Sequence, residues 1–382
     1  MRTNPTNDSL RFRLFWALLA FFSLGISNSF SQSKTTVSIK DDNFYINNEI
    51  TLKGRKIDTA SIEGLLPNSR MVQGIFDDLN PETRNLWKYP DTGIWDPDRN
   101  TNEFVSAMPD WKKHGLLAFT LNLQGGSPTG YGNKGWINPG FYKDGKIMPE
   151  YFARLEKILN KADKLGMVVI LGIFYFGQDE NLSDEKAIKN AVSNTIDWLF
   201  TKGYRNVLIE INNECNVNSY EHDILKPDRV SELIELAKNK KHPKAGYRFL
   251  VSTSYGGKHI PHPNVVKTAD FLLLHGNGAD RPEIIAQMVT DTKKVEGYHT
   301  MPIVFNEDDH YNFNEPVNNM LNAFKARASW GFFDFRKRGE TLKAGDQTFQ
   351  EGYQSIPVDW TINSQRKKDF FELLSKISYN NQ

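Results

Sequence analysis

The chain has 382 residues and a formal net charge of +1, and 39% of its residues are hydrophobic and 12% aromatic. This composition is typical of a folded chain with a large core, and the length fits one large α/β domain. The near-zero charge excludes the basic excess of a nucleic-acid-binding protein. The single cysteine, Cys215, excludes a disulfide within one chain and a cysteine-based zinc site.

The N-terminal segment has the pattern of a secretory signal peptide. Arginines precede an apolar run over residues 14–26, and small residues follow it where a signal peptidase cleaves. We therefore expect residues 1–31 to be a signal peptide and residues 32–382 to form one secreted or periplasmic domain, without a membrane partner after cleavage. The alternative is an uncleaved anchor, but the run is shorter than the ~20 residues that a membrane-spanning helix needs.

Strand patterns follow along the chain. Residues 44–52 predict a β-hairpin that turns at Asn47-Asn48, and its second arm is expected to continue through Arg55 as the first strand of a barrel. Seven later strands are predicted from short, nearly continuous apolar runs, which are typical of strands buried on both faces of a parallel sheet. These runs cover residues 116–123, 167–173, 207–211, 248–252, 271–274, 302–305 and 331–335.

Helical periodicity separates these strands. Apolar residues recur at helical spacing over residues 149–165, from residue 183 to 199, and over residues 228–237, 282–295, 317–328 and 367–377. Eight strands alternating with helices predict an α/β fold, a single (β/α)8 TIM barrel with a short N-terminal β-hairpin. An open doubly wound sheet is the alternative, which we disfavour because no G-x-G-x-x-G sequence follows a strand.

Two glutamates stand where such a barrel places its active site. Active sites of (β/α)8 barrels lie at the carboxyl ends of the strands, and Glu214 and Glu307 directly follow the fourth and seventh predicted strands. These strands lie nearly opposite each other, so that the two carboxyl groups can face a substrate from two sides. Hydrolysis of a glycosidic bond needs such a pair, one carboxyl protonated and the other ionised.

The sequence around Glu214 resembles a known family. Residues 210–214, Glu-Ile-Asn-Asn-Glu, are similar to the fourth-strand signature of glycoside hydrolase clan A, and residues 44–54 resemble the opening hairpin of family 5 within it. The resemblance implies a retaining glycosidase acting on β-linked sugars without a cofactor. It makes Glu214 the acid/base, Asn213 a ligand of the 2-hydroxyl of the attacked sugar, Glu307 the nucleophile and His275 a contact of the substrate or nucleophile.

The chain departs from the family pattern at several positions. Cys215 stands where the family usually has proline, Asn212 occupies a position that is usually not asparagine, and Glu307 is followed by Asp308 and Asp309 rather than by a small or aromatic residue. The resemblance is therefore that of a distant or unclassified member.

Further residues are candidates for substrate binding. Asn122 and Tyr175 fall at the ends of the second and third predicted strands, and Trp136 lies in a long loop rich in glycine and aromatic residues, whose rings can stack on sugars. Arg55 and Arg336 end the first and eighth predicted strands. A basic wall formed by these neighbours would suit an anionic polysaccharide.

Other functions stay open from the sequence. A barrel of this kind can be catalytically inactive and bind glycans, and the altered motif keeps that alternative. Asp308, Asp309 and His310 could instead bind a metal ion, although we expect no metal and no cofactor. Glu210 is expected to form a structural ion pair below the site, with Arg55 or an arginine near the eighth strand as its partner. The sequence gives no oligomeric state.

Overall fold

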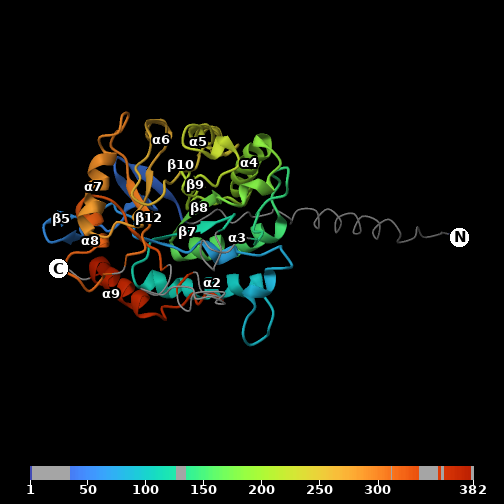
Figure 1. The fold of residues 1–382 in the computed structure, drawn as a ribbon, viewed down its shortest axis with the longest axis horizontal. Coiled ribbons are helices and arrows are strands. Elements are labelled where there is room, and N and C mark those ends of the chain that lie inside the picture. Colours follow the sequence, from blue (N-terminus) through green and yellow to red (C-terminus); the bar gives the residue numbers. More distant parts are fainter. Residues whose placement is uncertain (2–34, 126–134, 311, 335–351, 354–356, 380–382) are drawn as a thin grey trace. The chain divides into compact units, whose positions relative to one another are not determined.

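Parallel strands alternate with helices along the described chain (Figure 1). The computed structural model describes residues 1, 35–125, 135–310, 312–334, 352–353 and 357–379. The alternating strands are β6 (Asn68–Arg70), β7 (Ala118–Asn122), β8 (Val168–Phe174), β9 (Val207–Asn212), β10 (Leu250–Ser252), β11 (Leu272–His275), β12 (Ile303–Glu307) and β13 (Gly331–Phe332).

Pairing between these strands closes a ring. Strands β6 to β10 pair in order as one parallel sheet, and β13 pairs in parallel with β6. β11 pairs in parallel with β12. Single parallel bridges join these two sheets: Ser254 with Leu273, Val304 with Ser329, and Asp308 with Phe332. Each strand therefore has a parallel neighbour on both sides, as in the (β/α)8 barrel that the sequence predicts.

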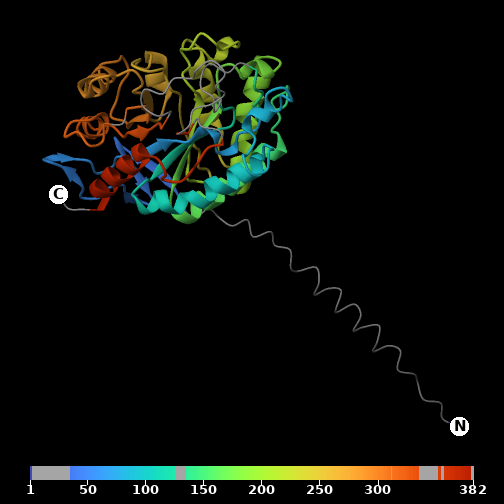
Figure 2. The ribbon, with the colours of Figure 1, turned by 60° about the horizontal axis from the view of Figure 1, so that its bottom comes forward.

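Each connection between consecutive barrel strands contains a helix, and the helices surround the strands (Figures 1 and 2). A final helix follows β13. The helices are α2 (Pro97–Lys113), α3 (Pro149–Leu165), α4 (Glu185–Lys202), α5 (Val230–Asn239), α6 (Pro263–Thr268), α7 (Pro282–Thr292), α8 (Asn319–Lys325) and α9 (Gln365–Tyr379), with short 3-10 turns η1 (Val72–Ile75), η2 (Arg84–Trp87), η3 (Asp179–Asn181) and η4 (Asp223–Leu225).

Local sequence signals set the ends of the helices. The Asp184 side chain caps α4 by accepting a hydrogen bond from the backbone N–H of Ala187, and Gly203 ends this helix with a φ of 76°. Six helices were predicted from their apolar periodicity, and all six form. α2 and α6 were not predicted. α2 carries Pro109 in its interior, and α6 has only six residues, so neither gives a long periodic pattern.

A small antiparallel sheet precedes the barrel. It contains β1 (Val37–Lys40), β2 (Asn43–Ile46) and β3 (Glu49–Ile50), and a further hairpin joins β4 (Lys56–Ile57) to β5 (Ala60–Ser61). The predicted turn at Asn47-Asn48 is confirmed, since both residues adopt the positive φ that a two-residue hairpin turn requires. The Phe44 ring packs edge-on against Phe271, which immediately precedes β11. The small sheet therefore lies at the amino ends of the barrel strands.

The position predicted for the first barrel strand was wrong. Arg55 lies between β3 and β4, beside the amino ends of the strands, and not at a carboxyl end of the barrel. The first barrel strand is β6, thirteen residues farther on, and its three residues are polar and fully buried. A prediction based on apolar runs could not find it, because β6 contains no apolar residue.

The core has two parts. One apolar cluster fills the space between strands and helices, and it includes Trp111, Leu171 and Phe305. A smaller cluster lies inside the barrel towards the amino ends, where Phe44 meets side chains such as Ile170. The carboxyl ends of the strands carry polar side chains instead. The groups that could take part in a reaction therefore lie at that end of the barrel.

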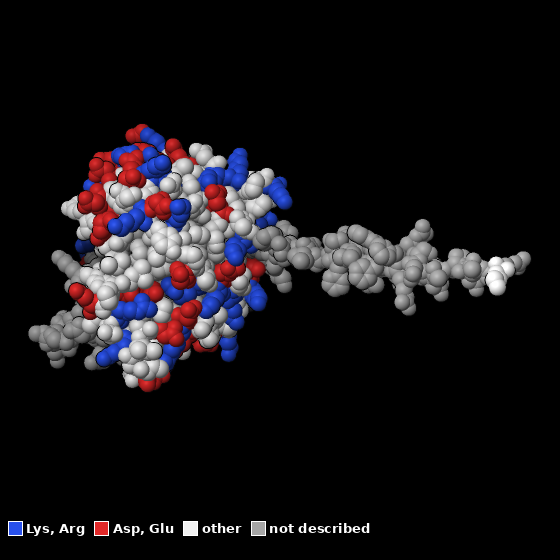
Figure 3. Space-filling model, turned by 90° about the vertical axis from the view of Figure 1, so that its right-hand side faces the viewer, with Lys and Arg blue, Asp and Glu red and all other residues white. Residues whose placement is uncertain are grey.

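Two further observations concern the surface. None of the helices in the described parts of the chain has the length and apolar character that crossing a membrane requires. On the face drawn in Figure 3, Lys and Arg side chains lie among Asp and Glu side chains.

The predicted signal peptide, residues 1–31, lies outside the described residues apart from Met1, and Arg336 lies outside them as well.

Candidate active site

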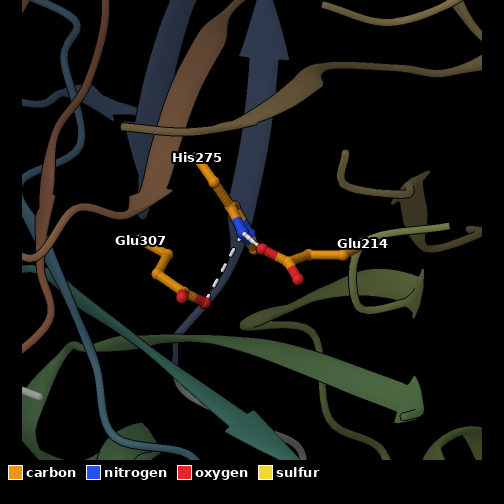
Figure 4. Close-up of side chains that lie close together, drawn as sticks. All are labelled: Glu214, His275 and Glu307. Atoms are coloured by element: carbon orange, nitrogen blue, oxygen red, sulfur yellow. Dashed lines mark hydrogen bonds and ion pairs between the residues drawn. The ribbon is translucent and has the colours of Figure 1, made fainter. Parts of the chain in front are cut away.

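Three side chains meet at the carboxyl ends of β9, β11 and β12. Glu214 lies two residues beyond β9, while His275 and Glu307 are the last residues of β11 and β12. His275 stands between the two glutamates (Figure 4). Its Nδ1 is 2.9 Å from Oε1 of Glu214 and 3.5 Å from Oε2 of Glu307. The fold thus joins three residues that lie up to 93 positions apart in the sequence (307 − 214).

The two carboxyl groups are close together and shielded from solvent. One oxygen of Glu214, one oxygen of Glu307 and a ring nitrogen of His275 all lie within 4.8 Å of one another. Glu214 is 8% exposed, Glu307 is 2% exposed, and His275 is fully buried. Charges in such a site interact strongly, because little water separates them.

A buried arginine that sequence reasoning missed organises this pair. Arg70, the last residue of β6, forms an ion pair with Glu307 through its Nε atom. Its Nη2 donates a hydrogen bond to Oδ1 of Asn213, and its Nη1 lies 3.9 Å from Glu210. Arg70 therefore connects the ends of β9 and β12 with a single positive charge. Glu210 does form an ion pair below the site, but its partner is Arg70, which the sequence did not suggest.

Two further hydrogen bonds hold Glu307 and Asn213. Asn277, two residues beyond β11, donates a hydrogen bond of 2.5 Å to Oε1 of Glu307. The backbone carbonyl of Asn213 accepts a hydrogen bond from the hydroxyl of Tyr220. Glu307 is consequently held on both carboxylate oxygens, by Arg70 on one side and by Asn277 on the other. Sequence reasoning missed Asn277 because it neither directly follows a predicted strand nor belongs to a sequence signature, as Glu214 does.

The backbone at Glu214 has an unusual conformation. Its φ of 52° lies in the left-handed region, which is costly for a residue other than glycine or asparagine. Its N–H donates to the hydroxyl oxygen of Ser254, and the N–H of Cys215 donates to the backbone carbonyl of Ser254. These two contacts from the end of β10 hold the turn, and so they direct the Glu214 carboxyl group towards His275.

The electrostatics of the two carboxyl groups differ. Burial raises the pKa of Glu214, while the positive charges of Arg70 and His259 oppose that rise. Burial also raises the pKa of Glu307, but there the guanidinium of Arg70 is in direct contact and Asn277 donates to the ionised form. More groups that favour the ionised form contact Glu307 than contact Glu214, and burial still leaves the pKa of both carboxyl groups raised. Burial lowers the pKa of His275, which favours its neutral form.

The interior of the barrel below the glutamates is polar. Asn122 pairs in register with Gly172, which in turn pairs with Glu210 on the next strand. A Cβ atom on Gly172 would lie only 2.3 Å from Oδ1 of Asn122, so the absence of a side chain there makes room for the amide. Burial, with the negative charges of Glu307 and other nearby carboxylates, raises the pKa of Tyr175 well above its ordinary value. Asn122 and Tyr175 thus lie beneath and beside the glutamates.

The other residues proposed for substrate binding are placed differently. Trp136 is half-buried in the loop after β7, and its carbonyl accepts a hydrogen bond from Gln178, which lies beyond the end of β8. It is therefore on the side of the barrel that carries the glutamates. Arg55 lies at the opposite end, and the structure does not describe Arg336. The basic wall that these two arginines were expected to form is thus not supported by Arg55.

Glu214, His275 and Glu307 have ligand atoms close enough to hold a metal ion. The donor set fits such an ion poorly, because the guanidinium of Arg70 already contacts the Glu307 carboxylate and would repel a second cation. The chemistry of this group is better matched to proton transfer and nucleophilic attack than to coordination.

A second cluster, Asp308, Asp309 and His310, also has metal-ligand chemistry. Both oxygens of Asp308 are engaged, one by His310 and the other by the side chains of Asn319 and Trp330. Burial lowers the pKa of His310, but hydrogen bonds to the two aspartates outweigh burial and raise it to about 10. His310 is therefore a cation at neutral pH and donates to the aspartates, which makes this cluster a structural network.

No protein-family model matches this chain. The curated proteins contain no match to it either. Solved structures do resemble it. A family 5 glycoside hydrolase mannosidase from Rhizomucor miehei superposes with a TM-score of 0.50 at 12% identity, and the match covers 90% of this chain and 97% of that one.

Two bacterial structures give a similar result. A β-glucosidase from Thermotoga maritima in complex with castanospermine has a TM-score of 0.51 at 10% identity, covering 85% of this chain and 100% of that one. A Bacteroides vulgatus protein provisionally assigned as a glycoside hydrolase has a TM-score of 0.50 at 11% identity, covering 86% of this chain. The chain spans only 60% of the Bacteroides protein's length. The chain therefore has the same (β/α)8 fold as solved glycoside hydrolase structures.

Proposed function

We propose that this protein is a secreted glycoside hydrolase that cleaves β-linked poly- or oligosaccharides with retention of configuration, using Glu214 as acid/base and Glu307 as nucleophile. The observation that carries the proposal is the convergence of these two carboxyl groups, whose oxygens lie within 4.8 Å of each other at the carboxyl end of the barrel. Carboxyl groups about 5 Å apart are typical of retaining glycosidases, whereas inverting enzymes need ~6.5–9.5 Å.

The surroundings of each carboxyl group support its role. A nucleophile must be ionised, and Glu307 has a guanidinium and an amide N–H on its two oxygens. An acid must hold a proton near neutral pH, and burial raises the pKa of Glu214. Glu214 is hydrogen-bonded to His275, whose neutral ring can accept the carboxyl proton or donate to the carboxylate. The arrangement therefore separates the two roles in the way the reaction requires.

The reaction then follows in two steps. A carboxylate oxygen of Glu307 attacks the anomeric carbon, the glycosidic bond breaks, and Glu214 gives its proton to the departing oxygen. In the second step Glu214 takes a proton from water, the water oxygen attacks the anomeric carbon, and the bond to Glu307 breaks. The sugar is released with its original configuration, and both glutamates return to their starting states. In this proposal Asn213 binds the hydroxyl next to the anomeric carbon, and the hydrogen bond that its Oδ1 accepts from Arg70 supports a fixed orientation of its side chain.

The substrate class rests on chemistry and on the fold. A mannosidase and a β-glucosidase share this fold, so β-mannosides and β-glucosides are the first substrates to test. The half-buried Trp136 lies on the same side of the barrel, and an aromatic residue there supports a role in stacking against a sugar ring. The arginine-rich, apolar N-terminal sequence supports export.

The test is hydrolysis of aryl β-glycosides and of plant and algal polysaccharides by the wild type and by Glu214→Gln and Glu307→Gln. Glu221→Gln, an exposed glutamate outside the pair, serves as the matched control. We expect both site variants to lose at least about a thousandfold in kcat/KM, and the control to keep its activity. The anomeric form of the first product, followed by NMR, separates retention from inversion.

Unchanged activity in either site variant would refute the assignment of that glutamate. An inverted product would refute the nucleophilic role of Glu307. If no substrate is cleaved and one glycan binds tightly, the barrel is a glycan-binding protein, the alternative that the departures at Asn212 and Cys215 keep open.

A further inference from the structure

The loop between β10 and α6 passes close to both glutamates. A Cβ atom on Gly256 would lie 3.6 Å from the carboxyl carbon of Glu214, and one on Gly257 would lie 2.3 Å from the backbone oxygen of Asn277. Asn277 is the residue that donates to Glu307. The two glycines thus allow this loop to run between the acid/base and the partner of the nucleophile.

Lys258 and His259 follow directly at the rim of the site. The backbone N–H of Lys258 donates to the carbonyl of His275. Its side chain extends over Gly278, since a Cβ there would lie 3.4 Å from Cε and 3.7 Å from Nζ. The ring of His259 turns back on the loop and contacts the carbonyls of Gly256 and Gly257 through Nδ1. The backbone of Lys258 and the ring of His259 are thereby held at the rim of the site, and both residues are exposed.

The backbone of Lys258 has a φ of 64°, in the left-handed region. Glycine or asparagine would adopt this conformation at lower cost, so a lysine there needs another reason. Many lysines of this chain pair with a carboxylate, for example Lys267 with Glu296 and Lys294 with Asp291. Within the residues that the structure describes, neither Lys258 nor His259 forms such an ion pair.

We propose that Lys258 and His259 form a subsite for an anionic group, a carboxylate or sulfate ester, on a sugar unit next to the bond that is cut. The inference rests on the proposed function and narrows its substrate class to anionic glycans. The basic contact that it proposes lies in the loop after β10, whereas the sequence predicted such a contact from arginines at the ends of the first and eighth strands. An ammonium and an imidazole, both free at their outer atoms, suit an anion that arrives from solvent.

The negative charges of Glu214 and Glu307 offer a competing explanation. Lys258 and His259 could simply offset those charges, and a positive charge on His259 does favour the ionised form of Glu214, against the effect of burial. Compensation of this kind would act on neutral and anionic substrates alike. A subsite for an anion would act on anionic substrates alone, which separates the two explanations.

The experiment compares kcat/KM on hydroxyethyl cellulose and carboxymethyl cellulose, which share a backbone and differ in charge. The variants are Lys258→Met, Lys258→Gly and His259→Gln. Lys258→Gly removes the charge and also relieves the left-handed backbone, so that a loss cannot be assigned to misfolding. Lys164→Met, an exposed lysine at the far end of α3, is the control.

We expect each variant at Lys258 to lower the carboxymethyl-to-hydroxyethyl ratio about three- to tenfold, the range of a partly exposed ion pair, and Lys164→Met to leave it unchanged. Added salt should lower the wild-type ratio. An unchanged ratio, or equal losses on both polymers, would overturn the proposal.

If the wild type cleaves neither polymer, affinity electrophoresis in the same two polymers measures the ratio of binding strengths. Stronger retardation by the charged polymer that Lys258→Gly abolishes would support the subsite, although the hydrolase assignment itself would then fail. Equal retardation, or none, would overturn the subsite.

Discussion

Replacing Arg70 by methionine removes the cation that contacts Glu307 and keeps a long, buried side chain in its place. Arg70 is 1% exposed, and its partners Glu307, Asn213 and Glu210 are buried as well. The variant thus leaves a carboxylate in the barrel with Asn277 as its remaining donor at Oε1, and without its counter-ion.

The size of the effect follows from this burial. Breaking a buried ion pair by removing one partner costs about 3–5 kcal/mol, because the other charge stays buried and unpaired. In a domain of this size that loss corresponds to a fall in Tm of roughly 5 °C. The pKa of Glu307, which burial already raises, should rise further when the guanidinium that opposes burial is gone. Glu307, the proposed nucleophile, then ionises only at higher pH.

Two assays measure these effects. A carboxyl group with a raised pKa in the folded state stabilises the fold below its unfolded pKa, and that stability is lost as pH rises through the folded pKa. Urea unfolding of Arg70→Met should therefore show a larger deficit at pH 8 than at pH 5. The acidic limb of kcat/KM against pH should move to higher pH, and kcat at pH 6 should fall at least about a hundredfold.

The control is Arg154→Met, which removes an equally buried arginine from α3, where it contacts Asp77 instead of the glutamate pair. This change should lower stability without moving the acidic limb. The reasoning about Arg70 is refuted if its variant unfolds like the wild type at both pH values, or if the acidic limb stays in place.

Three other changes test separate parts of the structure. Gly172→Ala should lower the free energy of unfolding by about 1–3 kcal/mol in urea denaturation, since the new methyl group overlaps the amide of Asn122. Asn277→Ala should lower kcat roughly tenfold and shift the acidic limb to higher pH, because Glu307 loses a donor to its ionised form. His310→Asn should cost stability mainly at low pH: a histidine with a pKa of about 10 stabilises the fold fully below about pH 6.5, and this contribution disappears as pH rises to about 10.

Each of these has its own contradicting result. A Gly172→Ala protein as stable as the wild type would mean that the barrel interior is loosely packed there. A kcat unchanged by Asn277→Ala would mean that the amide does not act on the nucleophile. A deficit of His310→Asn that is equal at pH 6 and pH 10, measured by urea unfolding, would mean that His310 is neutral in the folded protein.

The barrel was predictable from the sequence where its strands are apolar. Runs such as residues 167–173 are hydrophobic throughout because helices cover one face and the barrel interior the other. The first strand, Asn68-Ser69-Arg70, is buried without being apolar. Its side chains bond to other strands of the barrel, since Asn68 and Ser69 donate to the carbonyls of Phe305 and Phe332. The amide nitrogen of Asn68 and the hydroxyl of Ser69 thus find acceptors inside the fold, and this cannot be read from the residue types alone.

The candidate site was predictable where its residues directly follow a predicted strand, because active sites of (β/α)8 barrels lie at the carboxyl ends of the strands. That rule selects Glu214, His275 and Glu307, and the structure brings these three together. It does not select Arg70, because the strand that carries it was misplaced, or Asn277, which follows a register shift between Leu274 and His275.

The left-handed backbone of Glu214 has an evolutionary cost. A residue other than glycine or asparagine held at such a φ destabilises the fold by about 1–3 kcal/mol, which is a sizeable share of the stability of an ordinary domain. Selection for thermal tolerance alone should therefore repeatedly recover Gly or Asn at position 214, and each such variant would lose the proposed proton donor. At position 214 the proposed activity therefore favours glutamate, whereas the stability of the fold favours glycine or asparagine.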